Sequence, residues 1–534
     1  MIRINEIKLS LDESEENLIN KAAKKLSIAK KDISSISIIK KSVDSRDKEN
    51  IFFIYNVDVQ LQIDEDRVLS KNKNPKIFKN KDEKYVLPEL KRKSLKRPVV
   101  VGFGPAGMFA ALMLARQGLK PIVVERGKKV EERILDVKLF QTKHNLNEES
   151  NICYGEGGAG TFSDGKLNTG IKDKRVRHVI DTFVELGAQK EVAYSYTPHI
   201  GTDRLRKTVK NFRKEIINLG GEILFQTKVI DLIVANEQIY GVKVLSNGEV
   251  FDIETDTCVL ATGHSAIDIF TMLKKYNVNL MQKPFSIGLR IEHKREMINR
   301  SQYGKFYNHS ALESASYKLS CHSKHQRGLY TFCMCPGGEV VVSSSEKGRI
   351  SVNGMSNYAR NAENSNSALL VGIDPDKFPT SDVLSGFDLQ SQIESKAFIE
   401  AGKTYSPPCQ VLSDFFENRK STKFKSVEPS CKNGTSFVDI NNILPNFVTD
   451  MIKKSVPLMA KKLKGFDLPD AVLTAPETRS SCPVRVVRNE YMQIEEIKGL
   501  YPIGEGSGHS GGITSSAVEG IKAAEIIITD PVWT

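Results

Sequence analysis

A glycine-rich segment near residue 100 has the spacing of a phosphate-binding turn. Gly102, Gly104 and Gly107 follow the apolar run 99–101 as G-x-G-x-x-G and precede a stretch typical of a helix. Glycines at these places let the backbone approach a pyrophosphate, which then lies at the positive end of the helix. Glu125 stands 21 residues after Gly104, at the end of the next apolar run, where a carboxylate can bind an adenosine ribose. The pattern predicts a dinucleotide site without saying which dinucleotide.

Two later segments favour FAD over NAD. Residues 257–264 (TCVLATGH) resemble the strand and turn at which flavoproteins pass the dinucleotide again. Residues 499–513 (GLYPIGEGSGHSGGI) resemble the C-terminal FAD motif of flavin-dependent dehydrogenases. That resemblance implies that Glu505 meets the ribityl–phosphate portion and that the helix after Gly512 points at the flavin, where its N-terminus would stabilise negative charge. An enzyme using only NAD has no need of this second loop.

Further motifs extend the resemblance over nearly the whole chain. Residues 154–166, 198–203, 332–338 and 475–480 resemble those of bacterial FAD-dependent dehydrogenases in the glutathione-reductase superfamily. The resemblance implies one Rossmann domain with an inserted substrate domain, and it implies no substrate. The residues expected to bind FAD, with the Val229 main chain at the adenine, are Gly102, Gly104, Pro105, Ala106, Gly107, Glu125, Arg126, Gly158, Ala159, Gly160, Thr161, Lys166, Val229, Ala261, Thr262, Gly263, Gly504, Glu505, Gly512 and Ile513.

Three residues are the candidates for catalysis. His509 lies inside the loop expected to face the isoalloxazine, so it is predicted to transfer protons in preference to His264. Cys333 and Cys335 could form a redox pair beside the flavin. The alternative, two small residues beside a turn, is favoured because disulfide reductases of the superfamily carry their cysteines close behind the first βα unit.

Two further groups of residues could bind a ligand. A zinc site could be built from Cys321, His322, His325, Cys333 and Cys335, but their spacing matches no usual paired-ligand pattern, and no metal is expected. An anionic substrate could be held by charged residues of the later chain, although such residues are more often structural ion-pair partners. These residues are Arg290, Glu292, His293, Arg479 and Arg485.

The elements that must position these residues indicate an α/β protein. A Rossmann-type FAD-binding domain with a parallel sheet is expected over 96–265 and 494–534, interrupted by an α+β substrate domain at 266–493. Residues 1–95 read as a small, separable α+β domain that ends in a polar linker (64–97), and residues 128–175 read as loop-rich.

Composition excludes several classes of protein. The 534 residues are 40% hydrophobic and 27% charged, which fits a globular protein and neither a disordered nor a collagen-like one. Eight cysteines are too sparse for a disulfide scaffold. No apolar run reaches the roughly 20 residues that cross a bilayer, and the N-terminus lacks the pattern of a signal peptide. A cytoplasmic protein without membrane contact is expected.

The positive charge is concentrated at the start of the chain. Of the net +12, residues 1–97 contribute +7, with 23 Lys and Arg against 16 Asp and Glu. No aromatic residues interleave with the basic run 91–97, so a solvated linker is favoured over a nucleic-acid or phospholipid patch. The oligomeric state stays open.

The function expected is hydride transfer between flavin N5 and a small-molecule substrate. NAD(P)H, as a transient reductant, would have to bind without a second Rossmann domain. The alternatives are a tRNA-acting flavoprotein that uses the basic N-terminal module, a flavin monooxygenase, and a flavin-bound sensor without turnover. The monooxygenase is disfavoured because Glu505 stands where that class has Asp.

Overall fold

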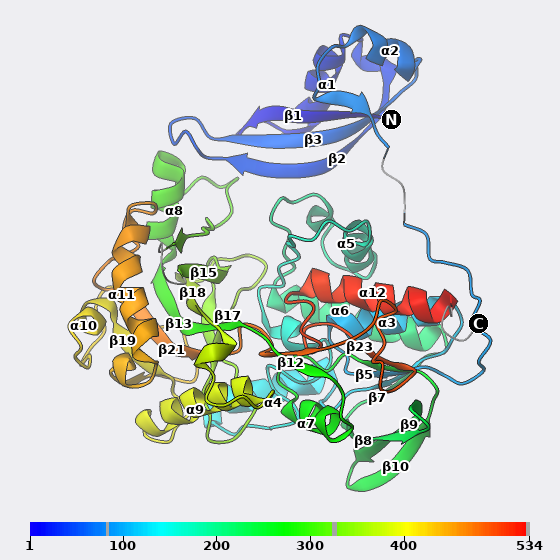
Figure 1. Ribbon diagram of the computed structural model, residues 1–534. Coiled ribbons are helices and arrows are strands. Elements are labelled where there is room, and N and C mark those ends of the chain that lie inside the picture. Colours follow the sequence, from blue (N-terminus) through cyan, green and yellow to red (C-terminus); the bar gives the residue numbers. More distant parts are fainter. Residues whose placement is uncertain (82–84, 323–327, 530–534) are drawn as a thin grey trace.

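A computed structural model describes residues 1–81, 85–322 and 328–529, which form a small N-terminal domain and two larger, interlocked ones (Figure 1). The N-terminal domain is an antiparallel sheet in the order β2-β3-β1-β4 with helix α1 packed on it. Leu18, Ala22 and Leu26 of α1 are buried. Its elements are β1 (Ile2–Ser10), α1 (Leu18–Leu26), β2 (Ile33–Asp44), β3 (Phe52–Leu61), α2 (Glu65–Lys71) and β4 (Ile77–Lys79).

The prediction of a linker over 64–97 is wrong in two places. Helix α2 and strand β4 complete the N-terminal domain. The helix begins at this point because the Asp64 side chain caps it, accepting from the N–H groups of Asp66 and Arg67. Farther on, Arg92 is not solvated: its guanidinium is buried, donates to Thr257 Oγ1 at 2.8 Å and pairs with Asp256. Arg92 therefore anchors the chain to the next domain, whereas Lys91, Lys93 and Lys96 of the basic run are exposed.

The second domain is built on a five-stranded parallel sheet in the order β23-β11-β5-β6-β7. Its strands are short valine-rich or leucine-rich runs, and the central ones are buried on both faces, as in other parallel sheets. They are β5 (Val99–Val101), β6 (Ile122–Val124), β7 (Glu222–Leu224), β11 (Cys258–Leu260) and β23 (Leu500–Pro502). Since β23 comes from the end of the chain, the intervening residues are inserted into this Rossmann-type domain.

Helices and a small antiparallel sheet flank the parallel sheet (Figure 1). Helix α12 lies against α3 closely enough that a Cβ on Gly520 would stand 2.2 Å from the Ala106 carbonyl oxygen. The region 128–175, expected to be loop-rich, contains the helix α4. The flanking elements are α3 (Pro105–Arg116), α4 (Val130–Lys143), α5 (Arg175–Glu185), α6 (Thr202–Asn218), α12 (Ile513–Thr529), β8 (Thr227–Ala235), β9 (Gln238–Ser246) and β10 (Glu249–Glu254).

The inserted domain is a seven-stranded, mostly antiparallel sheet in the order β14-β15-β18-β13-β21-β19-β20. Helices α8, α9 and α11 lie around it (Figure 1). The strands are β13 (Phe285–Lys294), β14 (Ser320–Cys321), β15 (Leu329–Cys335), β18 (Asn364–Ile373), β19 (Pro408–Val411), β20 (Ser436–Phe437) and β21 (Val472–Glu477), with the separate pair β16 (Glu339–Val342) and β17 (Val352–Met355). The helices are α8 (Arg295–Tyr303), α9 (Ser385–Glu400) and α11 (Asn446–Ala460).

The N-terminal domain is joined to its neighbour by backbone hydrogen bonds. Lys41, on the edge strand β2, donates its N–H to the Tyr194 carbonyl at 2.7 Å and accepts from the Tyr196 N–H at 2.8 Å. Within the described ranges, no helix combines the length and apolar character that crossing a bilayer requires.

Candidate functional site

A deep cleft lies at the carboxyl ends of the parallel strands, where open α/β sheets bind their ligands. Gly102 follows β5, Glu125 follows β6, Ala261 follows β11 and Gly504 follows β23, and all four line this cleft. Its walls enclose about 1410 Å³, part of which is open to solvent. One wall belongs to the Rossmann-type domain and the other to the inserted domain.

Bare backbone forms much of the first wall. Gly102 has a φ of +96°, and a Cβ there would stand 2.5 Å from the Ala261 carbonyl oxygen. A Cβ on Gly158 would stand 2.9 Å from the Gly104 Cα, so the loop containing Gly158 covers the turn that begins α3. Glycines at these positions leave the N-terminus of α3 facing the cleft, which is the geometry that accommodates a phosphate.

Glu125 organises the turns around it. Its Oε2 accepts from the Phe103 N–H at 2.8 Å, and its Oε1 accepts from the N–H groups of Gly127 (2.8 Å) and Gly155 (3.0 Å). The side chain is 4% exposed. Because a carboxylate oxygen has about two acceptor sites, Oε2 can accept one more hydrogen bond from a ligand in the cleft.

The structure brings most of the sequence-predicted cofactor residues together. Those that line the cleft are Gly102, Gly104, Pro105, Ala106, Glu125, Arg126, Gly158, Ala159, Gly160, Val229, Ala261, Thr262, Gly263, Gly504, Glu505, Gly512 and Ile513. Gly107, Thr161 and Lys166 do not. Gly107 instead packs α3 onto the preceding turn, and Thr161 donates to the Glu156 carbonyl at 3.0 Å.

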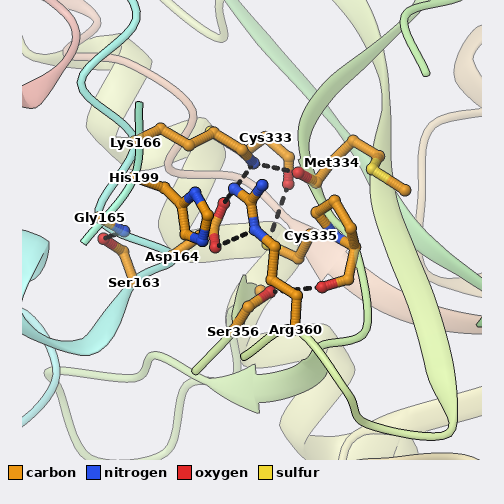
Figure 2. Close-up of polar contacts among 12 residues, drawn as sticks. Ser163, Asp164, Gly165, Lys166, His199, Cys333, Met334, Cys335, Ser356 and Arg360 are labelled. Atoms are coloured by element: carbon orange, nitrogen blue, oxygen red, sulfur yellow. Dashed lines mark hydrogen bonds and ion pairs between the residues drawn. The ribbon is translucent and has the colours of Figure 1, made fainter. Parts of the chain in front are cut away.

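Lys166 belongs to a polar cluster behind the second wall. Its Nζ donates to the Met334 carbonyl and lies 3.4 Å from Asp164 Oδ2 (Figure 2). Asp164 also accepts a hydrogen bond from Arg360 Nε at 3.1 Å. Burial works against the charge of Asp164, but the two cations lower its pKa below the ordinary value. In His199, which packs beside this pair, burial and Arg360 lower the pKa.

His509 was predicted to face the cofactor, but the structure places it outside the cleft. The imidazole is exposed outside the cleft, with Nε2 3.0 Å from the Val486 carbonyl oxygen. The loop turns at Gly508 (φ +77°) and packs so closely on residues 484–486 that His509 is directed away. His264 lines the cleft in its place, with Nδ1 3.5 Å from Glu505 Oε2.

The two candidate cysteines occupy different environments. Cys333 lines the cleft, whereas Cys335 is buried and donates its thiol to the Cys333 carbonyl at 3.3 Å. Cys333 has a φ of +40° and lies in a bulge of β15. Although Cys333 is exposed, the surrounding protein disfavours the charged thiolate and raises the thiol pKa to about 11. Both cysteines are free, and the Cys333 thiol is protonated near neutral pH.

Most residues of the second wall lie in segments singled out in the sequence, 332–338 and 475–480, but Asn353 lies outside them. Asn353, Glu477 and Ser480 line the cleft together with Phe332, and of the charged candidates only Arg479 does so. Arg290 lies just behind the wall and pairs with Glu477. The A-P-E-T-R-S segment at 475–480 was a usable signal. Among the described residues no cluster of His, Cys, Asp or Glu could hold a metal, and His325 lies outside them.

Family models match most of the chain. Residues 96–285 match the family model "Pyridine nucleotide-disulphide oxidoreductase", residues 284–480 match "FAD-dependent protein, C-terminal domain-like", and residues 1–60 match a domain of unknown function. Over 529 residues the chain is 46% identical to an "Uncharacterized protein" of Clostridium beijerinckii, covering 99% of this chain and 98% of that one. A digeranylgeranylglycerophospholipid reductase of Methanothrix thermoacetophila is 26% identical over 169 residues, 31% of this chain and 38% of that protein.

Similar solved structures are more distant. The flavin-dependent brominase Bmp2 has 12% identity and a TM-score of 0.37, with 81% of this chain and 78% of that chain covered. A geranylgeranyl bacteriochlorophyll reductase-like protein from Thermoplasma acidophilum has 12% identity and a TM-score of 0.34, with 81% and 77% covered. On its end-to-end match to the clostridial protein and on its domain families, the chain belongs to that protein's family and is an FAD-dependent oxidoreductase.

Proposed function

We propose that FAD lies along the cleft with its pyrophosphate at the N-terminus of α3. Gly104 and Gly158 leave the backbone open there, and a helix N-terminus favours an anion. Glu125 would bind the adenosine ribose through the acceptor site left on Oε2, and Val229 would meet the adenine. The flavin would then reach Gly512 and Ile513, close to the second wall.

The proposed reaction is hydride transfer between flavin N5 and a small organic substrate. FAD supplies the hydride chemistry when bound, and the protein's own part is to position the substrate. The observation that carries the proposal is that one continuous cleft joins the glycine wall to a wall of polar side chains from the inserted domain. A small molecule is favoured over nucleic acid because no aromatic residue interleaves with the basic run 91–97 for base stacking, and Arg92 within that run is buried.

Two measurements test this function. The purified protein should be yellow, and acid release followed by chromatography should yield one FAD per chain. Anaerobic mixing with NADH or NADPH, then with quinones and other artificial acceptors, should bleach and restore the flavin band. Release of FMN, or no flavin after reconstitution, would refute the cofactor site. A flavin band that no reductant bleaches would refute the reaction.

A further inference from the structure

One buried arginine organises the second wall of the cleft. Arg290, on β13, is 0% exposed. It donates to Glu477 from Nε (2.5 Å) and from one terminal nitrogen (3.0 Å), and it donates to the Cys333 carbonyl at 2.8 Å. It also donates to the amide oxygens of Asn353 (2.8 Å) and Asn366 (3.1 Å). These five bonds use all five N–H groups of the guanidinium.

The Asn353 amide is oriented by these contacts. Its Oδ1 accepts from Arg290 and also from the Gly354 N–H at 2.8 Å. Two donors on one oxygen determine which end of the amide is oxygen and which is nitrogen. Within the described part of the chain, no acceptor is bonded to Asn353 Nδ2, while the residue lines the cleft. Nδ2 is therefore the polar group that Asn353 has available for a ligand.

The charged side chains of this wall are already paired. The Glu477 carboxylate is bound by Arg290 and, despite burial, raises the pKa of that guanidinium. Burial raises the pKa of Glu477 itself, and Arg290 opposes that shift. Arg479 binds Glu394 through two bonds of 2.8 and 2.7 Å. Ser480 donates its hydroxyl to the Ser286 carbonyl, so the donors left toward the cleft are the neutral amide of Asn353 and the thiol of Cys333. With no unpaired cation in this wall, burying a substrate carboxylate would cost desolvation that a neutral donor does not offset, so an uncharged acceptor is favoured.

We propose that this wall binds the carbonyl oxygen of an uncharged substrate, with Asn353 Nδ2 as the donor held in place by Arg290. The inference rests on the proposed function, since it takes the flavin to occupy the same cleft. Arg290 and Glu477 are positioning residues here, because they reach the substrate only through Asn353. An uncharged ketone, aldehyde or amide is the class of substrate that fits.

The chain offers a matched pair of variants for the test. Asn353→Asp keeps the oxygen that Arg290 needs and replaces the donor with a second oxygen. Asn366→Asp makes the same change on the other amide of Arg290, which is fully buried and does not line the cleft. Both variants add one negative charge beside the guanidinium of Arg290. They differ in that only Asn353→Asp removes a hydrogen-bond donor from the cleft. Asn353→Ser is a milder second variant in case Asn353→Asp fails to fold.

The probes are acetophenone and benzoate, which match in size and differ in charge, titrated into the FAD-loaded protein while the flavin absorption is recorded. Acetophenone should perturb the flavin band with saturation and bind tighter than benzoate. Its affinity should fall about tenfold in Asn353→Asp, as expected when a buried acceptor loses its donor, and stay unchanged in Asn366→Asp.

Four results would overturn the inference. They are equal weakening in both variants, tighter binding of benzoate, no saturable response to acetophenone in the natural protein, and an Asn353→Asp protein that loses affinity for FAD itself, which would place the donor against the cofactor. Failure of the natural protein to hold FAD is a different outcome and refutes the proposed function instead.

Discussion

The two walls of the cleft are built by opposite means. The wall of the Rossmann-type domain presents glycine backbone, and its buried carboxylate, Glu125, binds mainly the protein's own amides. The wall of the inserted domain presents side chains gathered on Arg290. A wall of backbone fits the shape of FAD, which is always the same molecule. A wall of side chains can instead be altered by substitution to suit a particular substrate. Under the proposed function, cofactor affinity belongs to the first wall and substrate choice to the second.

The largest effect is expected from removing the centre of the second wall. Arg290→Met should lower the free energy of unfolding by about 3–5 kcal/mol, because Glu477 is left as an unpaired buried charge. Chemical denaturation followed by circular dichroism measures this loss. Replacing Glu477 by Leu in the same chain should recover part of it, since both charges are then gone.

Arg300→Met provides the control for that variant. Arg300 is 54% exposed and pairs with Glu296 on the same helix, so its loss should leave stability unchanged within error. If Arg290→Met were no more costly than Arg300→Met, the second wall would not depend on its buried arginine.

The first wall should respond to a single methyl group. Gly102→Ala puts a Cβ 2.5 Å from a backbone oxygen and also strains a φ of +96°; the two together should cost about 2–4 kcal/mol of stability. Affinity for FAD should fall at least about tenfold, since the turn must shift. Flavin fluorescence during titration of the apoprotein with FAD measures the affinity.

A second glycine separates strain from crowding. Gly118 has a similar φ of +77°, and an added Cβ there would meet nothing within 4 Å. Gly118→Ala should therefore cost about 1 kcal/mol from backbone strain alone and leave FAD affinity intact. Equal loss of FAD binding in both variants would contradict the view that the first wall works through close backbone approach.

The same contrast explains what could be read from the sequence. The glycine turns at 102–107 and 504–512 are local patterns, each sufficient to predict a piece of the first wall. The second wall joins residues 290, 333 and 477 of the seven-stranded sheet with residue 353 of the separate strand pair, and no spacing along the chain predicts such contacts. His509 was misplaced for a related reason: its position in the loop was clear, but the packing of that loop on residues 484–486 depends on the inserted domain.

The pH response of Cys333 tests whether the second wall carries a reactive thiol. Its pKa is raised to about 11, so the thiolate is a small fraction at pH 7 and grows as pH rises. Alkylation by iodoacetamide, measured at this residue by mass spectrometry, should accelerate about tenfold per pH unit between 7 and 10. Lys166→Met should slow it, because Lys166 is one of the cations that stabilise the thiolate. Rapid alkylation at pH 7, with a charge-transfer band on partial reduction, would instead identify a thiol-using reductase.

The smallest effect concerns support of the second wall by the N-terminal domain. The β2 edge holds residues 194–196 through Lys41. This segment continues to His199, whose backbone pairs with that of Lys166 in an isolated β-bridge. The Lys166 side chain in turn donates to the Met334 carbonyl, next to Cys333 in the chain. The N–H of Lys41 points away from β3, so Lys41→Pro removes the bond to Tyr194 without breaking the sheet. Lys41→Ala controls for the lost side chain. Val43→Pro controls for the proline itself. It puts a proline ring two residues farther along β2, where the backbone N–H points to the same outer edge of the strand as that of Lys41.

Amide exchange should accelerate in residues 194–200 for Lys41→Pro alone. The alkylation rate of Cys333 should then change by about two- to threefold, the low end of couplings transmitted through packed networks. Faster exchange with an unchanged alkylation rate would mean that the second wall stands without the N-terminal domain. In that case the comparison of the two walls would hold for the two larger domains by themselves, and the function of residues 1–81 would have to be sought on their own surface.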